Sequence, residues 1–406
     1  MANNTFTLLK RAIDKRDISS WQNASERLAN ERKAIEGLLE SGGDAYGFTS
    51  LFGPLDTIDA SDGYQSSLLQ WHLIGCPSEI PRRAGDWISA VKLQQLSLGG
   101  SGLSPETYLA ILNRFAGGIS YSIDLDASYS SADVVPASWW VHSVLDDSHP
   151  IRNNGDLIAL INGNFVSIGL LAYATERLIN CLCTLLATPA TVGFKGYGQT
   201  HSQTAIVRSL NIDAASNNRP QQSVLSRDCL PIISGILQEI SRSVEVVSSA
   251  STRKSCNPVF KFDSNDVVAI SNSSFLDFSA ASASLGLAHA TRLAARLLNK
   301  VVSTACVSAA ENDKDNPRWV QYPKVTLGYC IAIEGGEAGP MQMTGSESGG
   351  VEDLWDTGLA STNQLLNQLK ILDKELSVSL ECLSLANLNP KKTLTFDELL
   401  SLCEKL

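Results

Sequence analysis

The feature that most constrains the fold is a set of long segments in which apolar residues recur every three or four positions. Such segments span residues 228–250, 279–304 and 356–387, and residues 165–187 are apolar nearly all round. A repeat of three and four places apolar side chains on one face of a helix, and a helix that is apolar all round lies in a core. We therefore expect a mainly α-helical chain with long helices toward the C-terminus.

The remaining sequence predicts shorter elements. Ser104-Pro105-Glu106 is typical of a helix start, because Ser can cap, Pro suits the first turn and Glu favours the positive end. Shorter helices are expected at 7–40, 64–74, 86–98, 104–115 and after the capping-box pattern that opens at Thr395. Strand patterns occur at 258–262, 267–270 and 325–333.

Composition narrows the class of protein. With 32 basic and 42 acidic residues the net charge is −10, which argues against non-specific binding to nucleic acid. The longest uncharged apolar stretch, 178–194, is too short and too interrupted to span a membrane, and the N-terminus lacks a signal-peptide pattern. The nine cysteines are scattered, and none of the five histidines is paired at metal-ligand spacing. We expect a cytoplasmic protein with no metal site, no nucleic-acid partner and no membrane attachment.

Six short segments resemble, in the same order, motifs of the histidine and phenylalanine ammonia-lyases. They are Tyr46–Gly53, Leu68–His72, Gly99–Glu106, Leu160–Asn164, Ser271–Phe275 and Val351–Gly358. The resemblance implies a mainly α, ammonia-lyase-like fold. Residues 1–205 would form a smaller, loop-rich N-terminal part that carries active-site loops, and residues 206–406 the central helical bundle with the C-terminal helices. It also implies a homotetramer whose active sites combine loops of several subunits, which agrees with a charged fraction of only 18%.

The family makes its electrophile, a methylidene-imidazolone ring, from an internal Ala-Ser-Gly. Here Asp133 and Pro136 fix the register, so the equivalent residues are Ser130, Ser131 and Ala132. The serine that loses water is present as Ser131. The attacking nitrogen belongs to Ala132, whose Cβ disfavours the compressed backbone that glycine can adopt. We predict no cofactor, with ring formation from these residues disfavoured.

The resemblance assigns roles to several retained positions. Tyr46 matches the family's general base, Asn162 an asparagine near the electrophile or substrate, and Glu352 a glutamate near the substrate amine. Gln222 matches a further site glutamine, and Phe275 is expected to contact the substrate. His72 is either a site histidine or a core histidine with satisfied hydrogen bonds.

Two positions in the Gln222 motif depart from the family. The family's tyrosine is Leu225 here, and the arginine that clamps the amino-acid carboxylate is Asp228. Arginine suits a carboxylate because its guanidinium donates two parallel hydrogen bonds, whereas an aspartate repels one. We therefore expect a substrate without a free α-carboxylate, either a small molecule or a carrier-bound acyl group.

Three functions remain open on these residues. The first is a ring-free lyase-type enzyme or cyclase that acts in secondary metabolism. In it, Tyr46 and Glu352 carry out acid–base chemistry for elimination, addition or intramolecular cyclisation. The second is a divergent amino acid ammonia-lyase or aminomutase that contains the ring. The third is an inactive scaffold or binding protein, against which the joint retention of the matched polar site residues argues.

Overall fold

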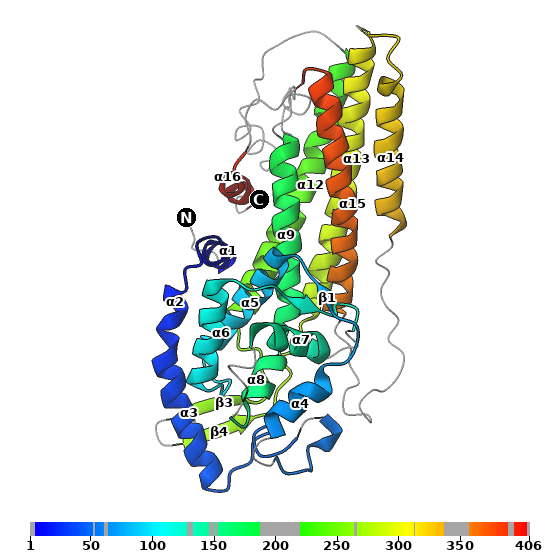
Figure 1. The fold of residues 1–406 in the computed structure, drawn as a ribbon. Coiled ribbons are helices and arrows are strands. Elements are labelled where there is room, and N and C mark those ends of the chain that lie inside the picture. Colours follow the sequence, from blue (N-terminus) through cyan, green and yellow to red (C-terminus); the bar gives the residue numbers. More distant parts are fainter. Residues whose placement is uncertain are drawn as a thin grey trace. The chain divides into compact units, whose positions relative to one another are not determined.

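A computed structural model gives the fold of the chain over most of its length (Figure 1). It describes residues 5–51, 53–60, 64–127, 133–145, 151, 153–186, 220–263, 266–311, 313–336, 357–388 and 394–403. The described residues are mainly helical, with two short two-stranded sheets, which confirms the predicted fold class. The chain divides into two compact units whose segments alternate along the sequence. The predicted boundary at 205/206 lies outside the described residues and stays a prediction.

Unit 1 is formed by residues 1–173, 246–282 and 340–363. Its helices are α1 (Thr5–Lys15), α2 (Ser19–Gln22), α3 (Ala24–Glu40), η1 (Gly53–Leu55, a 3-10 turn), α4 (Tyr64–His72), α5 (Arg82–Leu96), α6 (Pro105–Gly117), α7 (Val134–Val144) and α8 (Asp156–Ile161), followed by the start of α9 (Phe165–Leu186). Its antiparallel strand pairs are β1 (Ser78–Glu79) with β2 (Ser122–Ile123), and β3 (Val259–Asp263) with β4 (Asp266–Ile270). The strands predicted at 258–262 and 267–270 are confirmed, whereas α7 and α8 had not been predicted.

Helix α5 forms the centre of unit 1, and most of its residues are buried on every side. Trp87, at its middle, is fully buried and stacks at a tilt on Phe6 of α1, with 4.8 Å between ring centroids. Arg16, just after α1, has a φ of 52°, and its guanidinium donates to both carboxylate oxygens of Asp86 at 2.9 and 2.6 Å. This bidentate pair holds the end of α1 against α5.

Unit 2 is formed by residues 174–245, 283–339 and 364–406. It contains the rest of α9 and most of α12 (Pro220–Ser251), α13 (Phe278–Ala310) and α15 (Gly358–Leu385), together with α14 (Arg318–Gly335) and α16 (Phe396–Cys403). The long helices run side by side in Figure 1 and are linked by polar pairs. These pairs include Thr175 with Ser243, Asn299 with Thr326, Cys306 with Cys382 and Tyr322 with Glu381. The predicted long helices are confirmed.

One local prediction is wrong, and another, the helix start at Ser104-Pro105-Glu106, is confirmed except for the cap by the Ser104 side chain. Residues 325–333 were expected to form a strand because the run is rich in β-branched residues, but they lie inside α14. The buried positions Tyr322, Thr326, Cys330 and Ile333 recur at helical spacing, and this decides the structure. Ser104 makes no side-chain cap at the start of α6; its hydroxyl donates to Asp156 at 2.6 Å instead.

The capping box at α16 is confirmed. The Glu398 carboxylate accepts the Thr395 N–H at 2.8 Å, and the Thr395 hydroxyl accepts the Glu398 N–H at 3.2 Å. This reciprocal arrangement satisfies two of the N–H groups that a helix start leaves unpaired.

One segment of the described chain is long and apolar enough to span a membrane. It runs over Asp156–Leu186, and 94% of its most apolar window is buried inside the structure. Such burial is typical of the core helix of a soluble protein. Cys181 and Cys183, on this segment, are buried free thiols as predicted.

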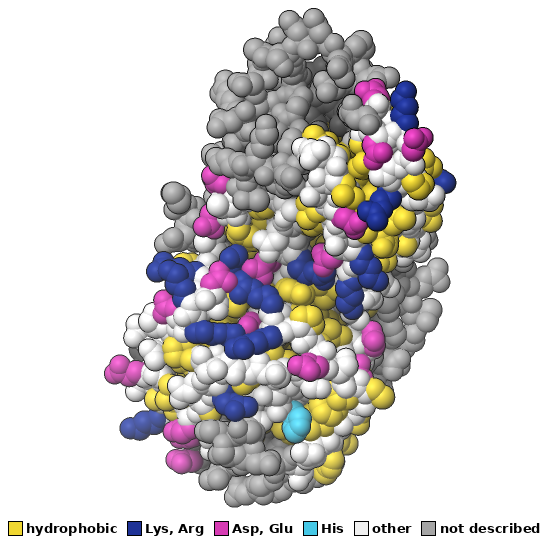
Figure 2. Space-filling model, turned by 45° about the horizontal axis from the view of Figure 1, so that its top comes forward, with side chains coloured by type: hydrophobic (Ala, Val, Ile, Leu, Met, Phe, Trp, Pro, Cys, Tyr) yellow, Lys and Arg dark blue, Asp and Glu magenta, His cyan; other side chains and the backbone are white. Residues whose placement is uncertain are grey.

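Helix α14 carries an exposed apolar stripe. Val320, Leu327 and Ile331 are 58%, 50% and 61% exposed and lie at helical spacing on one face. In the space-filling view, hydrophobic side chains are numerous on the side where Figure 1 draws α13 and α14 (Figure 2). Contiguous exposed apolar surface of this kind commonly marks an interaction site.

Candidate functional site in unit 1

Tyr46 lies in a run of turns between α3 and η1. Its half-buried ring packs against a cluster that includes Phe48 and Ile158. The phenolic oxygen accepts a hydrogen bond from the Gly53 N–H at 2.7 Å. This hydrogen bond fixes the position of the phenolic oxygen at the edge of the loop.

Gly47 seats the Tyr46 loop on α8. Its φ is 72°, and a Cβ at this position would lie 2.7 Å from Cγ2 of Ile158. Only glycine combines this backbone angle with so close an approach. Helix α8 ends at Ile161. The helix that contacts the Tyr46 loop is therefore directly followed by Asn162.

Phe48, in the first matched motif, contacts the Gly99–Glu106 motif, the loop before α8 and strand β3. Its ring meets Phe260 of β3 edge-on, with centroids 5.0 Å apart. A Cβ on Gly102 or Gly155 would lie 2.6 or 2.0 Å from the Phe48 ring, and both glycines have positive φ. The Gly99–Gly102 turn and the loop before α8 therefore pack around Phe48, two positions after Tyr46.

Arg32 of α3 holds the same loops from the other side. Its guanidinium donates to the carbonyl oxygens of Gly102 and Asn154 at 2.9 and 3.0 Å. It also lies over the Phe48 ring, 5.8 Å from the centroid. One buried cation thus joins the Gly-rich turn, the approach to α8 and the Tyr46 loop.

Asn162 follows α8 with an extended backbone (φ −85°, ψ 124°) and is 7% exposed. Its carboxamide Oδ1 is buried and has no hydrogen-bond partner among the residues that the structure describes. An unsatisfied buried polar atom costs about 1–3 kcal/mol. The Asn162 carboxamide is therefore a position at which a donor from a bound molecule would be stabilised.

Lys92 of α5 lies beneath the Asn162 turn and is 1% exposed. Its Nζ donates to the carbonyl oxygens of Ala159 at 2.8 Å and Asn162 at 3.1 Å, and lies 4.6 Å from the centroid of the Phe165 ring. Burial lowers the pKa of Lys92 to about 7, opposed by the nearby thiol of Cys256. The two carbonyls belong to the end of α8, where helix carbonyls lack intrahelical partners and a cation is favoured.

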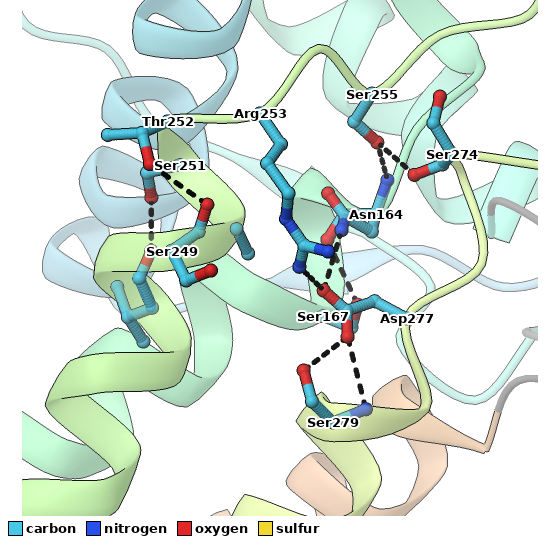
Figure 3. A network of polar contacts seen from close by, with 12 residues as sticks. Asn164, Ser167, Ser249, Ser251, Thr252, Arg253, Ser255, Ser274, Asp277 and Ser279 are labelled. Atoms are coloured by element: carbon cyan, nitrogen blue, oxygen red, sulfur yellow. Dashed lines mark hydrogen bonds and ion pairs between the residues drawn. The ribbon is translucent and has the colours of Figure 1, made fainter.

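A polar network fixes Asn164, two positions after Asn162 (Figure 3). The Asn164 N–H donates to Ser255 Oγ at 3.0 Å, and its Nδ2 donates to Asp277 at 3.2 Å. Asp277 also accepts a hydrogen bond from Arg253 at 2.8 Å. Ser255 donates to the Ser274 carbonyl at 3.2 Å, which connects the Leu160–Asn164 match to the Ser271–Phe275 match.

Two further predicted site residues are described. His72 ends α4, and its Nδ1 lies 2.7 Å from the Leu68 carbonyl oxygen, so Nδ1 carries the proton in this pair. Phe275 is half-buried in the loop that follows β4, next to Ser274. The structure thus packs the Tyr46 loop against α8, the helix that Asn162 directly follows, and connects the Phe275 loop to Asn164. The substrate roles of His72 and Phe275 stay predictions.

The remaining predicted residues cannot be placed on this site. Gln222, Leu225 and Asp228 belong to the first turns of α12, and their side chains lie outside the described residues. Glu352 and the triad equivalents Ser130, Ser131 and Ala132 also lie outside them. Their assignments stay predictions.

Sequence interpretation missed Lys92, Ser255 and Asp277. A signal for Lys92 was present: within the helix predicted at 86–98 it falls on the buried stripe with Ile88 and Leu96, where a charged residue needs a special partner. Ser255 and Asp277 carried no comparable signal, because their role depends on contacts with residues about a hundred positions away.

Comparison with known proteins agrees with the mainly helical fold. Residues 5–145 match the family model described as aromatic amino acid lyase. No curated protein matches the chain in sequence. Among solved structures, the phenylalanine aminomutase of Pantoea agglomerans is similar at a TM-score of 0.75 and 15% identity, over 98% of this chain and 92% of that one. The tyrosine aminomutase of Streptomyces globisporus gives 0.72 and 14%, over 98% and 94%.

Histidine ammonia-lyase from Trypanosoma cruzi is also similar, with a TM-score of 0.68 and 14% identity, over 94% of this chain and 88% of that one. At these identities the structures establish a common fold. The chain thus shares the fold of ammonia-lyases and aminomutases, and its N-terminal third matches the aromatic amino acid lyase model, in agreement with the resemblance of its motifs.

Proposed function

We propose that the chain is a lyase-type enzyme that uses Tyr46 and Glu352 as acid–base groups and works without the methylidene-imidazolone ring. The reaction would be an elimination, an addition or an intramolecular cyclisation, in secondary metabolism. The observation that carries the proposal is that the Tyr46 loop packs on α8, the helix that Asn162 directly follows. The loop that carries Tyr46 and the turn that carries Asn162 thereby both contact or adjoin the same helix.

The contacts of Tyr46 support its role as the base. The Gly53 N–H donates to its oxygen and so fixes the hydroxyl, and the hydrophobic cluster around Phe48 holds its ring. A base must accept a proton from the substrate, and a positioned side chain of this kind contributes about a hundred- to ten-thousand-fold to the rate. Glu352 would exchange the second proton.

The residues at the ring position do not fit the ring. The family's ring closes through a glycine nitrogen, and the nitrogen here belongs to Ala132, with a bulky Tyr129 before the triad. Asp133, the first described residue after the triad, already has a left-handed backbone (φ 49°) and is buried. The Cβ of Ala132 disfavours the compressed backbone that glycine can adopt for ring closure. No step of the proposed reaction passes through the ring.

The proposed substrate lacks a free α-carboxylate. Asp228 replaces the family's carboxylate-binding arginine, and Leu225 replaces its tyrosine. The buried Oδ1 of Asn162 accepts hydrogen bonds and so suits an N–H or O–H group of the substrate. An amine meets both conditions, as does an ester or a carrier-bound acyl group that also carries an N–H or O–H group.

The proposal includes assembly into a homotetramer in the cytoplasm. The exposed apolar stripe of Val320, Leu327 and Ile331 on α14 lies within the region, 228–387, expected to form the subunit contacts. A second copy of the chain would cover it, which also suits active sites shared between subunits.

A combined measurement tests the proposal. The intact mass of the purified chain is expected to equal the mass of its sequence, and the chain is expected to turn over amines or esters while leaving free phenylalanine, tyrosine and histidine unchanged. A mass lower by two water molecules, with ammonia released from a free amino acid, would instead establish the ring-containing ammonia-lyase or aminomutase. An unmodified chain that turns over no member of either set would favour the inactive scaffold.

A further inference from the structure

The Asn162–Asn164 turn is held tightly at every residue. Gly163 has a φ of 145°, and a Cβ there would lie 2.6 Å from the Ser255 carbonyl oxygen and 3.6 Å from Lys92 Nζ. Gln95 donates to Asn164 Oδ1 at 2.8 Å, which completes the anchoring of that side chain. Within this turn, Asn162 keeps a buried side-chain oxygen without a partner among the described residues.

Lys92 is the one side chain shown to contact both sides of this turn. Through Ala159 and Asn162 it binds the end of α8, and through the Phe165 ring it contacts the first residue of α9. Its donors reach main-chain oxygens, so they fix the backbone that carries Asn162 and leave the carboxamide for another partner. A fully buried lysine is expensive, and most proteins place one in a core only for a specific purpose.

We propose that Lys92 is a positioning residue for the proposed reaction: its Nζ fixes the backbone of the Asn162–Asn164 turn and thereby holds the Asn162 carboxamide in place for the substrate. This inference rests on the proposed function for its catalytic consequence. Its structural part, the control of the turn by Lys92, stands separately. Lys92 need not touch the substrate.

The test compares Lys92→Met with Lys92→Arg in the full chain. Methionine keeps the length and apolar stem but removes every donor, whereas arginine keeps donors that can reach carbonyl oxygens. The control is Lys33→Met on the exposed face of α3. Hydrogen exchange of peptides spanning 157–165 reports the order of the turn without any ligand. A melting curve for each variant shows that it is folded.

Lys92→Met is expected to speed hydrogen exchange in 157–165 at least about tenfold, while α6 keeps its protection. Lys92→Arg is expected to restore most of the protection of 157–165. On the amine or ester turned over by the wild type, Lys92→Met is expected to lower kcat about ten- to a hundredfold with little change in KM, because misplacement affects the reacting geometry. Lys92→Arg is expected to restore most of kcat.

Unchanged exchange in 157–165 for a folded Lys92→Met would overturn the inference. So would faster exchange combined with undiminished kcat, because the turn would then be loose without consequence for the reaction. If the wild type turns over none of the amines, esters and free amino acids tested, the proposed function fails. Faster exchange in Lys92→Met and its rescue by Lys92→Arg would still establish that Lys92 controls the turn.

Discussion

At the scale of single residues, Tyr46 combines a packed ring with a polar oxygen. The ring belongs to the cluster with Phe48 and Ile158, and the oxygen accepts the Gly53 N–H. A change that removes only the hydroxyl keeps the ring in its cluster. Chemistry and packing can therefore be separated at this position.

Tyr46→Phe is expected to lower activity on the substrate about a hundred- to ten-thousand-fold, because the proton acceptor is lost. Stability should fall by only about 1 kcal/mol, the value of one hydrogen bond. Steady-state kinetics and a melting curve measure the two effects. Tyr329→Phe in α14 provides the same chemical change outside the site. Full activity in Tyr46→Phe would refute the assignment of the base.

Ser131→Ala is expected to leave activity nearly unchanged, because no ring is proposed to form from this serine. Glu352→Gln is expected to weaken activity, and more strongly for a substrate that carries an amine. Intact mass and kinetics of both variants provide the measurement. An enzyme disabled by Ser131→Ala would require the ring, and the ring-free proposal would then be wrong.

The candidate site residues that the sequence predicts are those that carry a family motif. Tyr46 and Asn162 stand in short, recognisable patterns with glycines beside them, and the structure explains the glycines: Gly47 admits Ile158, and Gly163 admits Ser255. Lys92 escaped prediction because a single lysine in a helix is normally assigned to the solvent-exposed face. Its partners are main-chain oxygens, which leave no trace in the sequence.

At the scale of elements, α14 and α15 share a buried acidic group. Glu375 of α15 is fully buried, and the Cys330 thiol of α14 donates to its Oε1 at 3.4 Å. Its Oε2 has no partner among the described residues. Burial raises the pKa of Glu375 to about 8, so the carboxyl group is largely protonated near neutrality.

This carboxyl group makes stability depend on pH in a defined window. Between 4.5, the ordinary value, and about 8, the folded state keeps a proton that the unfolded state loses, so stability falls as pH rises. The contribution is at most about 1.4 kcal/mol per pH unit. Below this window the neutral group imposes no charge penalty. Above it the full penalty is present.

Glu375→Gln is expected to remove this decline, because glutamine stays neutral at every pH. Melting temperatures at pH 5, 6.5 and 8 should converge for the variant while the wild type loses several degrees across the range. Glu311→Gln, at an exposed position after α13, is the control. Parallel pH curves for wild type and Glu375→Gln would show that the carboxyl group titrates normally.

Element prediction succeeded where one periodicity dominated. The segment 279–304 is rich in alanine and leucine and became α13. The strand prediction for 325–333 was wrong, because Val325, Thr326 and Ile331 each favour a strand individually. Burial of Thr326, Cys330 and Ile333 along one helical face outweighed those preferences.

At the scale of the whole molecule, the exposed stripe on α14 predicts association. Light scattering at micromolar concentration is expected to give the mass of a tetramer. Ile331→Glu places a charge on the stripe and should lower the measured mass, whereas Lys324→Glu, at an exposed position between Val320 and Leu327, should weaken association less because no apolar contact is lost. A wild-type chain that scatters as a monomer would contradict both the assembly and the shared active sites.

The alternation of the two units along the sequence determines when unit 1 can be completed during synthesis. Phe48 packs on Phe260, and Asn164 is anchored by Ser255 and Asp277, so the early loops meet their partners only after residue 277 has left the ribosome. Until then the surfaces around Tyr46 and Asn162 stay uncovered. A nascent chain ending soon after the family match at residue 145 exposes the Phe48 ring and is a natural client for a chaperone.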